Sequence, residues 1–217
     1  MSLTNFKPYY QFIDNQARHT WIIISGWALL GSFVIKPVKK SNILFISDYN
    51  PYLLSKNIEK YLCYYGIHNY SVMGFSLGAL WLSHYLSYFT QAKHMVFSGV
   101  RSSYPSQPIQ RLRIDLDLDK DKVLSSFWKD CRPPITNKKN FVKSHTEYSW
   151  QDERLLRGLD YLEKFKFHWP TPEKKILFFH GQLDRIAPLK EITKQNNYDF
   201  RVIKRQGHIC LPDLDGI

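Results

Sequence analysis

The sequence predicts an α/β protein built on a mostly parallel β-sheet with helices on both faces. Short apolar runs at 21–24, 43–46 and 176–179 are continuous rather than alternating, as in strands that are buried on both faces. Between two of these runs, the segment 53–65 carries apolar residues at helical spacing. Alternation of buried strands and helices is typical of a parallel sheet that is covered on both sides.

The first hundred residues supply most of the expected elements. An edge strand is expected within 6–13. The next strand, at 21–24, ends in Ser25-Gly26-Trp27, a bend that leaves backbone amides exposed at the carboxyl end of the strand. The later strands and helices are expected, in chain order, at 43–46, 53–65, 70–73, 80–89 and 95–97.

The pattern changes after residue 100. Residues 114–119 alternate between apolar and acidic, 123–128 have helical spacing, and 149–152 resembles a capping box that opens another helix. We interpret 101–169 as an inserted helical cap over the active edge of the sheet. The alternative is an ordinary helical layer of the same domain.

The chain returns to the sheet at 170. A strand at 176–179, a short helix at 189–195 and a last strand at 200–203 are expected. Residues 1–100 and 170–217 would then form the core.

Composition limits the class of protein. The 217 residues are 44% hydrophobic and 16% aromatic, as in a folded globule rather than a disordered chain. No apolar run approaches the length of a membrane span, and the first twenty residues lack the order of a secretory signal. Three distant cysteines indicate neither a disulfide framework nor a paired-cysteine metal site. We expect a cytoplasmic protein without a membrane span.

The chain carries a net charge of +11, from 30 Lys and Arg against 19 Asp and Glu. Such a balance can mark nucleic acid, an anionic membrane surface or an acidic protein as the partner. Lysines that simply accumulate on solvated faces would give the same balance. The charge is the only feature that points to nucleic acid, so we do not expect nucleic acid as a partner.

The stretch 70–79 has the shape of a nucleophile elbow. An apolar run leads into Gly-Phe-Ser-Leu-Gly at 74–78, and a long apolar helical pattern follows. A sharp strand-to-helix turn would hold Ser76 in a strained conformation and lift its hydroxyl above the sheet edge. Gly74 and Gly78 are expected because side chains there would collide as the two elements close up. The bland alternative is a tight structural turn that happens to contain serine.

Ser76 needs a base to take its proton and a carboxylate to orient that base. Asp184 follows the penultimate strand within His-Gly-Gln-Leu-Asp, and His208 follows the last strand in Gly-His. Three residues in the order serine, acid, histidine, each in a loop after a strand, are more specific than any one of them. The predicted catalytic triad is therefore Ser76, Asp184 and His208.

These motifs resemble the α/β-hydrolases, and the resemblance covers nearly the whole chain. It implies an oxyanion hole made by the backbone amides of Leu77, after the nucleophile, and Trp27, after the early strand. Ser25 stands where the family commonly has histidine. The resemblance implies no metal and no organic cofactor.

Within that family, Gly-Trp after the early strand and Ser-Leu-Gly at the elbow resemble the esterases of biotin synthesis. Those enzymes hydrolyse the methyl ester of pimeloyl-acyl carrier protein, and their acidic carrier docks on basic lid residues. The resemblance implies an acyl carrier protein as partner, with candidate contacts at Arg111, Arg113, Arg132, Lys138, Lys139, Arg154 and Arg157. A general short-acyl esterase or thioesterase, and a catalytically silent binding protein for an acidic partner, remain as alternatives.

The remaining histidines have no metal-ligand spacing. His180 is expected to pack or hydrogen-bond behind the Asp184 loop, and His145, like the others near element ends, is expected at the surface. The cap aromatics Phe127, Trp128 and Trp150 are expected in the core, with an acyl tunnel as the alternative reading.

Overall fold

One sheet of seven strands runs through the centre of the molecule. In the computed structural model, which describes residues 9–134, 138–171, 173, 175–192, 198 and 200–217, the strand order is β1-β3-β2-β4-β5-β6-β7. β1 pairs antiparallel with β3, and every other neighbouring pair is parallel. This confirms the predicted fold class. The strands are β1 (Tyr9–Ile13), β2 (Thr20–Ile24), β3 (Asn42–Ser47), β4 (Tyr70–Phe75), β5 (Met95–Ser98), β6 (Ile176–Gly181) and β7 (Phe200–Ile203).

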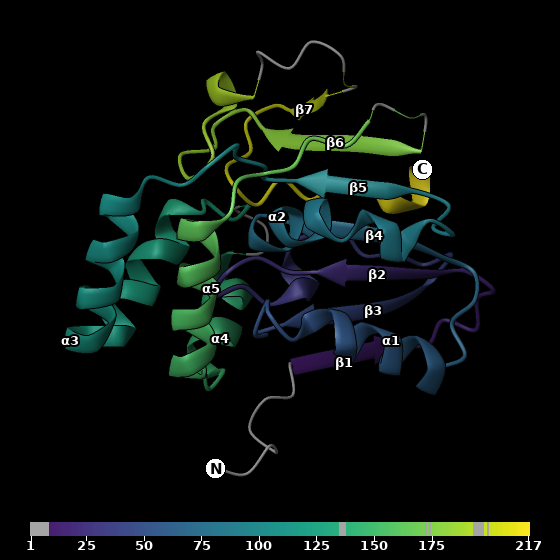
Figure 1. Ribbon diagram of the computed structural model, residues 1–217, viewed down its shortest axis with the longest axis horizontal. Helices are drawn as coiled ribbons and strands as arrows, with labels where there is room; N and C mark the ends of the chain where they lie inside the picture. Colours follow the sequence, from purple (N-terminus) through teal and green to yellow (C-terminus); the bar gives the residue numbers. More distant parts are fainter. Residues whose placement is uncertain (1–8, 135–137, 172, 174, 193–197, 199) are drawn as a thin grey trace.

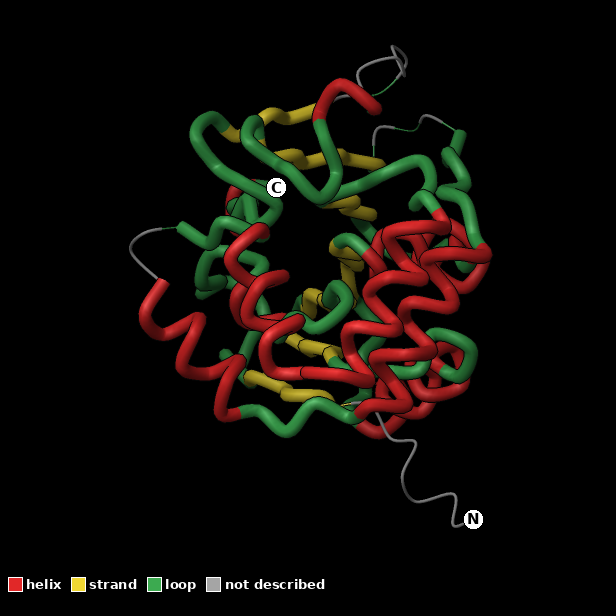
Figure 2. Tube along the Cα trace, turned by 90° about the vertical axis from the view of Figure 1, so that its left-hand side faces the viewer, coloured by secondary structure: helices red, strands yellow, loops and turns green. Residues whose placement is uncertain are grey.

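Helices lie on both sides of the sheet, as the stack of strands in Figure 2 shows. The α-helices are α1 (Leu54–Tyr64), α2 (Leu77–His84), α3 (Ser106–Asp130), α4 (Lys138–Glu147) and α5 (Asp152–Lys164). Short 3-10 helices occupy Gly31–Phe33, Leu86–Phe89, Leu189–Glu191 and Leu214–Gly216. α5 packs against both α2 and α3, and α4 packs against α3.

The helices α3, α4 and α5 lie together beyond the carboxyl ends of the parallel strands (Figure 1). All three come from the segment 101–169, which the sequence predicted as a cap. The loops that follow β2, β4, β5, β6 and β7 open at this same edge. Ligands of parallel sheets bind at that edge, so the cap faces the place where a site is expected.

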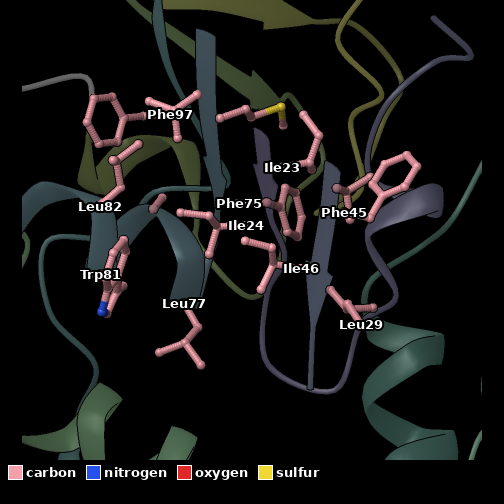
Figure 3. Close-up of a cluster of buried hydrophobic side chains, with 14 of the residues drawn as sticks. Ile23, Ile24, Leu29, Phe45, Ile46, Phe75, Leu77, Trp81, Leu82 and Phe97 are labelled. Atoms are coloured by element: carbon pink, nitrogen blue, oxygen red, sulfur yellow. The ribbon is translucent and has the colours of Figure 1, made fainter. Parts of the chain in front are cut away.

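The central strands are buried because helices cover both of their faces. Every residue of β2, β4, β5 and β6 is buried. Figure 3 shows part of the resulting core, in which Ile23 and Ile24 of β2 and Phe75 of β4 lie among apolar side chains from both faces. Each such side chain contributes roughly 1.5–3 kcal/mol by leaving water. The core fixes the strand ends that carry the candidate site.

The cap differs from the sequence prediction in two places. Residues 114–119 alternate but are helical, and lie in α3. Their alternation is misleading because Leu116 is buried while Ile114 and Leu118 face solvent. α3 is also interrupted at Asp119, whose φ of −158° and ψ of 84° are not helical. The helix therefore has two arms.

The predicted capping box at 149–152 does not form. The N-cap of α5 is Gln151, and its side chain makes no capping hydrogen bond. The helix instead begins with Asp152 and Glu153 in its first turn, where their charge complements the amino end of the helix dipole.

His145 is fully buried rather than at the surface. Its Nε2 accepts a hydrogen bond from the Leu30 amide at 3.0 Å, and its Nδ1 donates to the Phe141 carbonyl at 2.8 Å. Trp128 and Trp150 surround the ring, and both indoles are buried in the core, as predicted. His145 thus joins α4 to the loop that follows β2.

Candidate active site

Ser76 has the backbone of a nucleophile elbow. Its φ of 53° and ψ of −113° lie in a region that a residue with a side chain rarely adopts. The strain is held by hydrogen bonds on both sides, from the Ser76 amide to the Ser98 carbonyl at 2.8 Å and from the Leu80 amide to the Ser76 carbonyl at 2.9 Å. Ser76 is 7% exposed and begins α2 as its N-cap. The sharp turn predicted from the sequence is therefore present.

The two elbow glycines are required by close contact. A Cβ at Gly78 would lie 2.2 Å from the carbonyl oxygen of Ile24, and one at Gly74 would lie 2.5 Å from the carbonyl oxygen of Gly78. Both contacts are with backbone, which cannot move aside as a flexible side chain can. The collision predicted at these positions is confirmed.

Asp184 and His208 form a buried pair. His208 Nδ1 donates to Asp184 Oδ2 at 2.7 Å, and both side chains are fully enclosed. The other carboxylate oxygen, Oδ1, accepts hydrogen bonds from the amides of Ile186 and Ala187 at 2.9 and 2.8 Å. Burial alone would raise the pKa of Asp184, but the attraction and hydrogen bond of His208 and the hydrogen bond from the Ala187 amide outweigh it and hold the pKa below its usual range. The carboxylate is therefore ionised and orients the imidazole.

The His208 ring lies beside the elbow. Its centroid is 5.0 Å from that of Phe75, the residue before Ser76. A Cβ at Gly99 would lie 2.9 Å from His208 Cε1. His208 Nε2 is buried and makes no hydrogen bond with any described group. Because the carboxylate holds Nδ1 as the donor, Nε2 is the nitrogen left to accept a proton.

Two further side chains hold the Asp184 turn. His180 Nε2 donates to the Ala187 carbonyl at 2.6 Å, as expected for a residue behind the Asp184 loop. Burial lowers the pKa of His180, although the nearby Asp184 charge opposes this, so the ring is neutral. Arg101, which sequence reasoning missed, donates to the Ile186 carbonyl at 3.1 Å and pairs with Glu191 at 2.9 Å.

The two residues of the predicted oxyanion hole, Leu77 and Trp27, come from different elements that meet at Ser76. Leu77 is the first residue of α2, where backbone amides have no partner within the helix. Trp27 follows β2, and a Cβ at the preceding Gly26 would lie 3.1 Å from Ser76 Cβ. The Trp27 indole donates to the Leu155 carbonyl at 2.8 Å. This bond fastens the Trp27 loop to α5 of the cap.

A cavity of about 310 Å³ opens beside Ser76. Both arms of α3 line it, with Ile109 and Leu112 on the first arm and Val123 and Phe127 on the second. Phe127 therefore lies in the cavity wall, whereas Trp128 on the same turn lies in the core. The cavity also reaches Trp27, Arg101, Tyr104, Leu159, Leu162 and Ile186. Its apolar lining with few polar groups is that of a small-molecule site.

Arg101 and Tyr104 could have been found from their position. Both follow the carboxyl end of β5 closely, at the edge where the triad loops meet. The signal that identifies them is the occurrence of polar side chains directly after a buried strand of the parallel sheet.

The basic residues predicted as docking contacts divide by exposure. Arg111 and Arg157 project from α3 and α5 with side chains 74% and 53% exposed. Lys138 and Lys139 are exposed at the start of α4. Arg111 pairs at 3.0 Å with Asp115, which lines the cavity, so this arginine stands at its rim.

The other three are more enclosed. Arg154 is turned inward and bonds to the carbonyl and the carboxylate of Asp48, both at 3.0 Å, so its guanidinium cannot serve a surface partner. Arg113 binds Glu163 at 2.8 Å, and Arg132 is half-buried against Gly207. Arg154 and Arg157, three residues apart on α5, therefore have different surroundings.

No cluster of three His, Cys, Asp or Glu side chains in the described part of the chain could hold a metal ion. Of the described helices, none has the length and apolar character needed to cross a membrane.

The fold is shared with known enzymes although the sequence is not. No protein-family model and no curated protein matches the chain. An esterase (EaEST) from Exiguobacterium antarcticum matches with a TM-score of 0.75 at 14% identity, over 95% of this chain and 90% of that one. A bromoperoxidase from Bacillus anthracis matches at 0.73 and 16%, over 93% and 88%. BioG from Haemophilus influenzae matches at 0.66 and 12%, over 93% and 94%. The chain has the α/β-hydrolase fold.

Proposed function

We propose that this protein is a serine ester hydrolase. The observation that carries the proposal is the placement of Ser76, strained at the start of α2 and beside an apolar cavity, next to the buried Asp184–His208 pair, whose imidazole packs on Phe75. A structural turn would need neither an oriented imidazole with a vacant nitrogen nor a cavity at its serine. The structural likeness to esterases supports the same class.

The first half of the reaction forms an acyl-enzyme. His208 Nε2 takes the proton of Ser76 Oγ, and the oxygen attacks the ester carbon. The amides of Leu77 and Trp27 would donate to the oxyanion, each such donor being worth about 10²–10³ in kcat. His208, held by Asp184, then protonates the departing alcohol.

The second half frees the enzyme. Water, activated by the same histidine, attacks the acyl-enzyme carbonyl, and the carboxylic acid leaves Ser76 with its proton restored. The proposed reaction uses proton transfers among Ser76, His208, the departing alcohol and water.

The preferred substrate in this proposal is pimeloyl-acyl carrier protein methyl ester. The resemblance of the elbow and Gly-Trp motifs to the biotin-synthesis esterases supports it, as does the apolar cavity between the arms of α3. The exposed bases Arg111, at the cavity rim, and Arg157, on α5, suit an acidic carrier. A general short-acyl esterase or thioesterase is the second candidate, because an apolar cavity by itself selects no carrier.

Labelling by a serine-reactive fluorophosphonate tests the reaction class. The native protein is expected to label and Ser76→Ala is not. Ser83→Ala serves as the matched control, since Ser83 is buried in α2 and its hydroxyl donates to the Leu80 carbonyl. A native protein that stays unlabelled, or a Ser76→Ala variant that labels equally well, would favour the catalytically silent binding protein.

Growth without biotin tests the substrate. We expect this chain to restore it in a strain that lacks its pimeloyl-ester esterase, and Ser76→Ala not to. A well-expressed protein that labels with fluorophosphonate but does not restore growth would point to the general esterase.

A further inference from the structure

Tyr104 presents a buried hydroxyl that the triad and the predicted oxyanion hole do not use. The hydroxyl oxygen is inaccessible to solvent, and among the described side chains Ser76 is the hydrogen-bonding group that it approaches. The residue lines the same cavity as Ser76. A ligand bound at Ser76 would therefore come within reach of the Tyr104 hydroxyl.

The topology places Tyr104 on a particular side of the serine. β4, which ends at Phe75 directly before Ser76, lies between β2 and β5 in the sheet. Trp27 follows β2 and Tyr104 follows β5. The Tyr104 hydroxyl therefore approaches Ser76 from the side opposite the predicted oxyanion donor, and from the side on which β6 and β7 bring Asp184 and His208. This is the side where the alcohol portion of an ester leaves.

The tyrosine is held in place and stays protonated. The Arg101 guanidinium lies 5.5 Å from the centre of the Tyr104 ring, and Arg101 is itself fixed by Glu191. Burial raises the pKa of Tyr104 to about 12, although Ser76 and Arg101 lower it in part. At neutral pH the hydroxyl is a hydrogen-bond donor and not a base.

We propose that Tyr104 is a catalytic residue whose hydroxyl donates a hydrogen bond to the alcohol-side oxygen of the bound ester. The inference rests on the proposed serine hydrolase activity. In acylation the Ser76 Oγ–carbon bond forms and the bond from that carbon to the alcohol oxygen breaks. The proton passes from Ser76 through His208 to the departing oxygen. Tyr104 keeps its own proton throughout and stabilises negative charge on that oxygen as the bond breaks.

Such a donor matters most when the leaving oxygen is strongly basic. A methoxide carries much developing charge and gains from the hydrogen bond, whereas p-nitrophenolate delocalises its charge and gains little. The proposal therefore predicts an effect that depends on the leaving group, which a merely structural tyrosine would not produce.

The test compares Tyr104→Phe with the native protein on methyl and p-nitrophenyl esters of the same acid. For the methyl ester, kcat/KM is expected to fall about 10- to 100-fold, less than the roughly 10²–10³ for loss of an oxyanion-hole donor, because His208 also serves the departing oxygen. For the p-nitrophenyl ester it is expected to fall less than about threefold, by the same principle. Tyr198→Phe is the matched control, because its hydroxyl donates to the Pro170 carbonyl, away from the site.

Tyr104→Phe keeps the ring and removes only the hydroxyl, so the variant is expected to fold. Fluorophosphonate labelling of Tyr104→Phe checks that Ser76 is intact. Equal losses on both esters, or no loss on either, would overturn the role of Tyr104. Full methyl ester hydrolysis by Ser76→Ala would instead overturn the serine hydrolase proposal itself.

Discussion

At the scale of single residues, the site depends on backbone geometry as much as on chemistry. Ser76 can hold a positive φ only because Gly74 and Gly78 let the strand, the helix and the neighbouring β2 meet at backbone contact. The strain is local and is supported by a fully buried core.

Asp184→Asn tests the orientation of His208. Asparagine can still accept the Ile186 and Ala187 amides, so the loop is expected to keep its form. Its NH2 group would face His208 Nδ1 and, as a donor, favour the tautomer that carries the proton on Nε2. That nitrogen could then not accept the Ser76 proton, so kcat is expected to fall about 10³- to 10⁴-fold. Hydrolysis of a p-nitrophenyl ester measures kcat, and an unchanged thermal midpoint would show that the fold is intact. Near-native kcat would remove Asp184 from the triad.

Asp184 and His208 could be paired from the sequence because parallel strands deliver their loops to one edge. Order along the chain was enough for this, and the structure brings the two side chains to 2.7 Å. Tyr104 also follows a strand, β5, but no motif marks it among the residues of that connection. His145 could not be placed from the sequence, because its burial depends on the path of the cap, for which the sequence contains no periodic signal.

At the scale of elements, the cap is joined to the core through buried polar contacts. α4 is joined through His145 to the Leu30 amide, and α5 is joined through Arg154 to Asp48. The strands were predictable as continuous apolar runs. The two arms of α3 were not, because the alternation of Asp with Leu and Ile in 114–119 matches a strand as well as a helix.

His145 should make the stability of the protein depend on pH. Burial lowers its pKa from 6.5 to about 4. As the pH falls, His145 therefore takes up a proton at a higher pH in the unfolded chain than in the folded chain. Its contribution is present above pH 6.5 and is lost as pH falls toward 4, by up to about 3 kcal/mol. Urea unfolding at several pH values measures this slope. His145→Gln, whose side-chain oxygen can accept the Leu30 amide, should flatten it, and an unchanged slope would contradict the prediction.

Arg154 and Arg157 allow a matched test of the cap attachment. The Arg154 and Asp48 side chains are only 12% and 1% exposed, so Arg154→Met leaves a buried carboxylate without its cation. The expected loss of stability is about 3–5 kcal/mol. Arg157→Met on the same helix removes an exposed pair with Glu153 and should change stability by less than about 1 kcal/mol. Equal losses in the two unfolding curves would mean that Arg154 does not attach α5.

At the scale of the whole molecule, the net charge of +11 acts on partners over the longest distance. In the proposed function it draws an acidic carrier toward the cap. The sequence is enough to count this charge. It was not enough to tell that Arg154 points inward and Arg157 outward, because their contacts with Asp48 and Glu153 depend on how α5 packs.

Charge reversal measures this attraction. Arg111→Glu combined with Arg157→Glu is expected to lower kcat/KM for a carrier-bound ester about tenfold or more, mainly through slower association, and to spare a small soluble ester. Lys60→Glu, on the exposed surface of α1, is the control. Added salt should reduce the native rate on the carrier-bound ester in the same way. Equal losses on both substrates would remove the docking hypothesis.

The break in α3 at Asp119 has a consequence for how this protein could change over evolutionary time. The candidate catalytic groups follow strand ends, while much of the cavity wall belongs to α3, a helix of 25 residues that is kinked at Asp119. Substitutions at Leu112 or Phe127 would reshape the space for the acyl chain without disturbing the strands. Selectivity can therefore diverge within α3 alone while the elbow stays constant, so relatives with the same triad can differ in substrate.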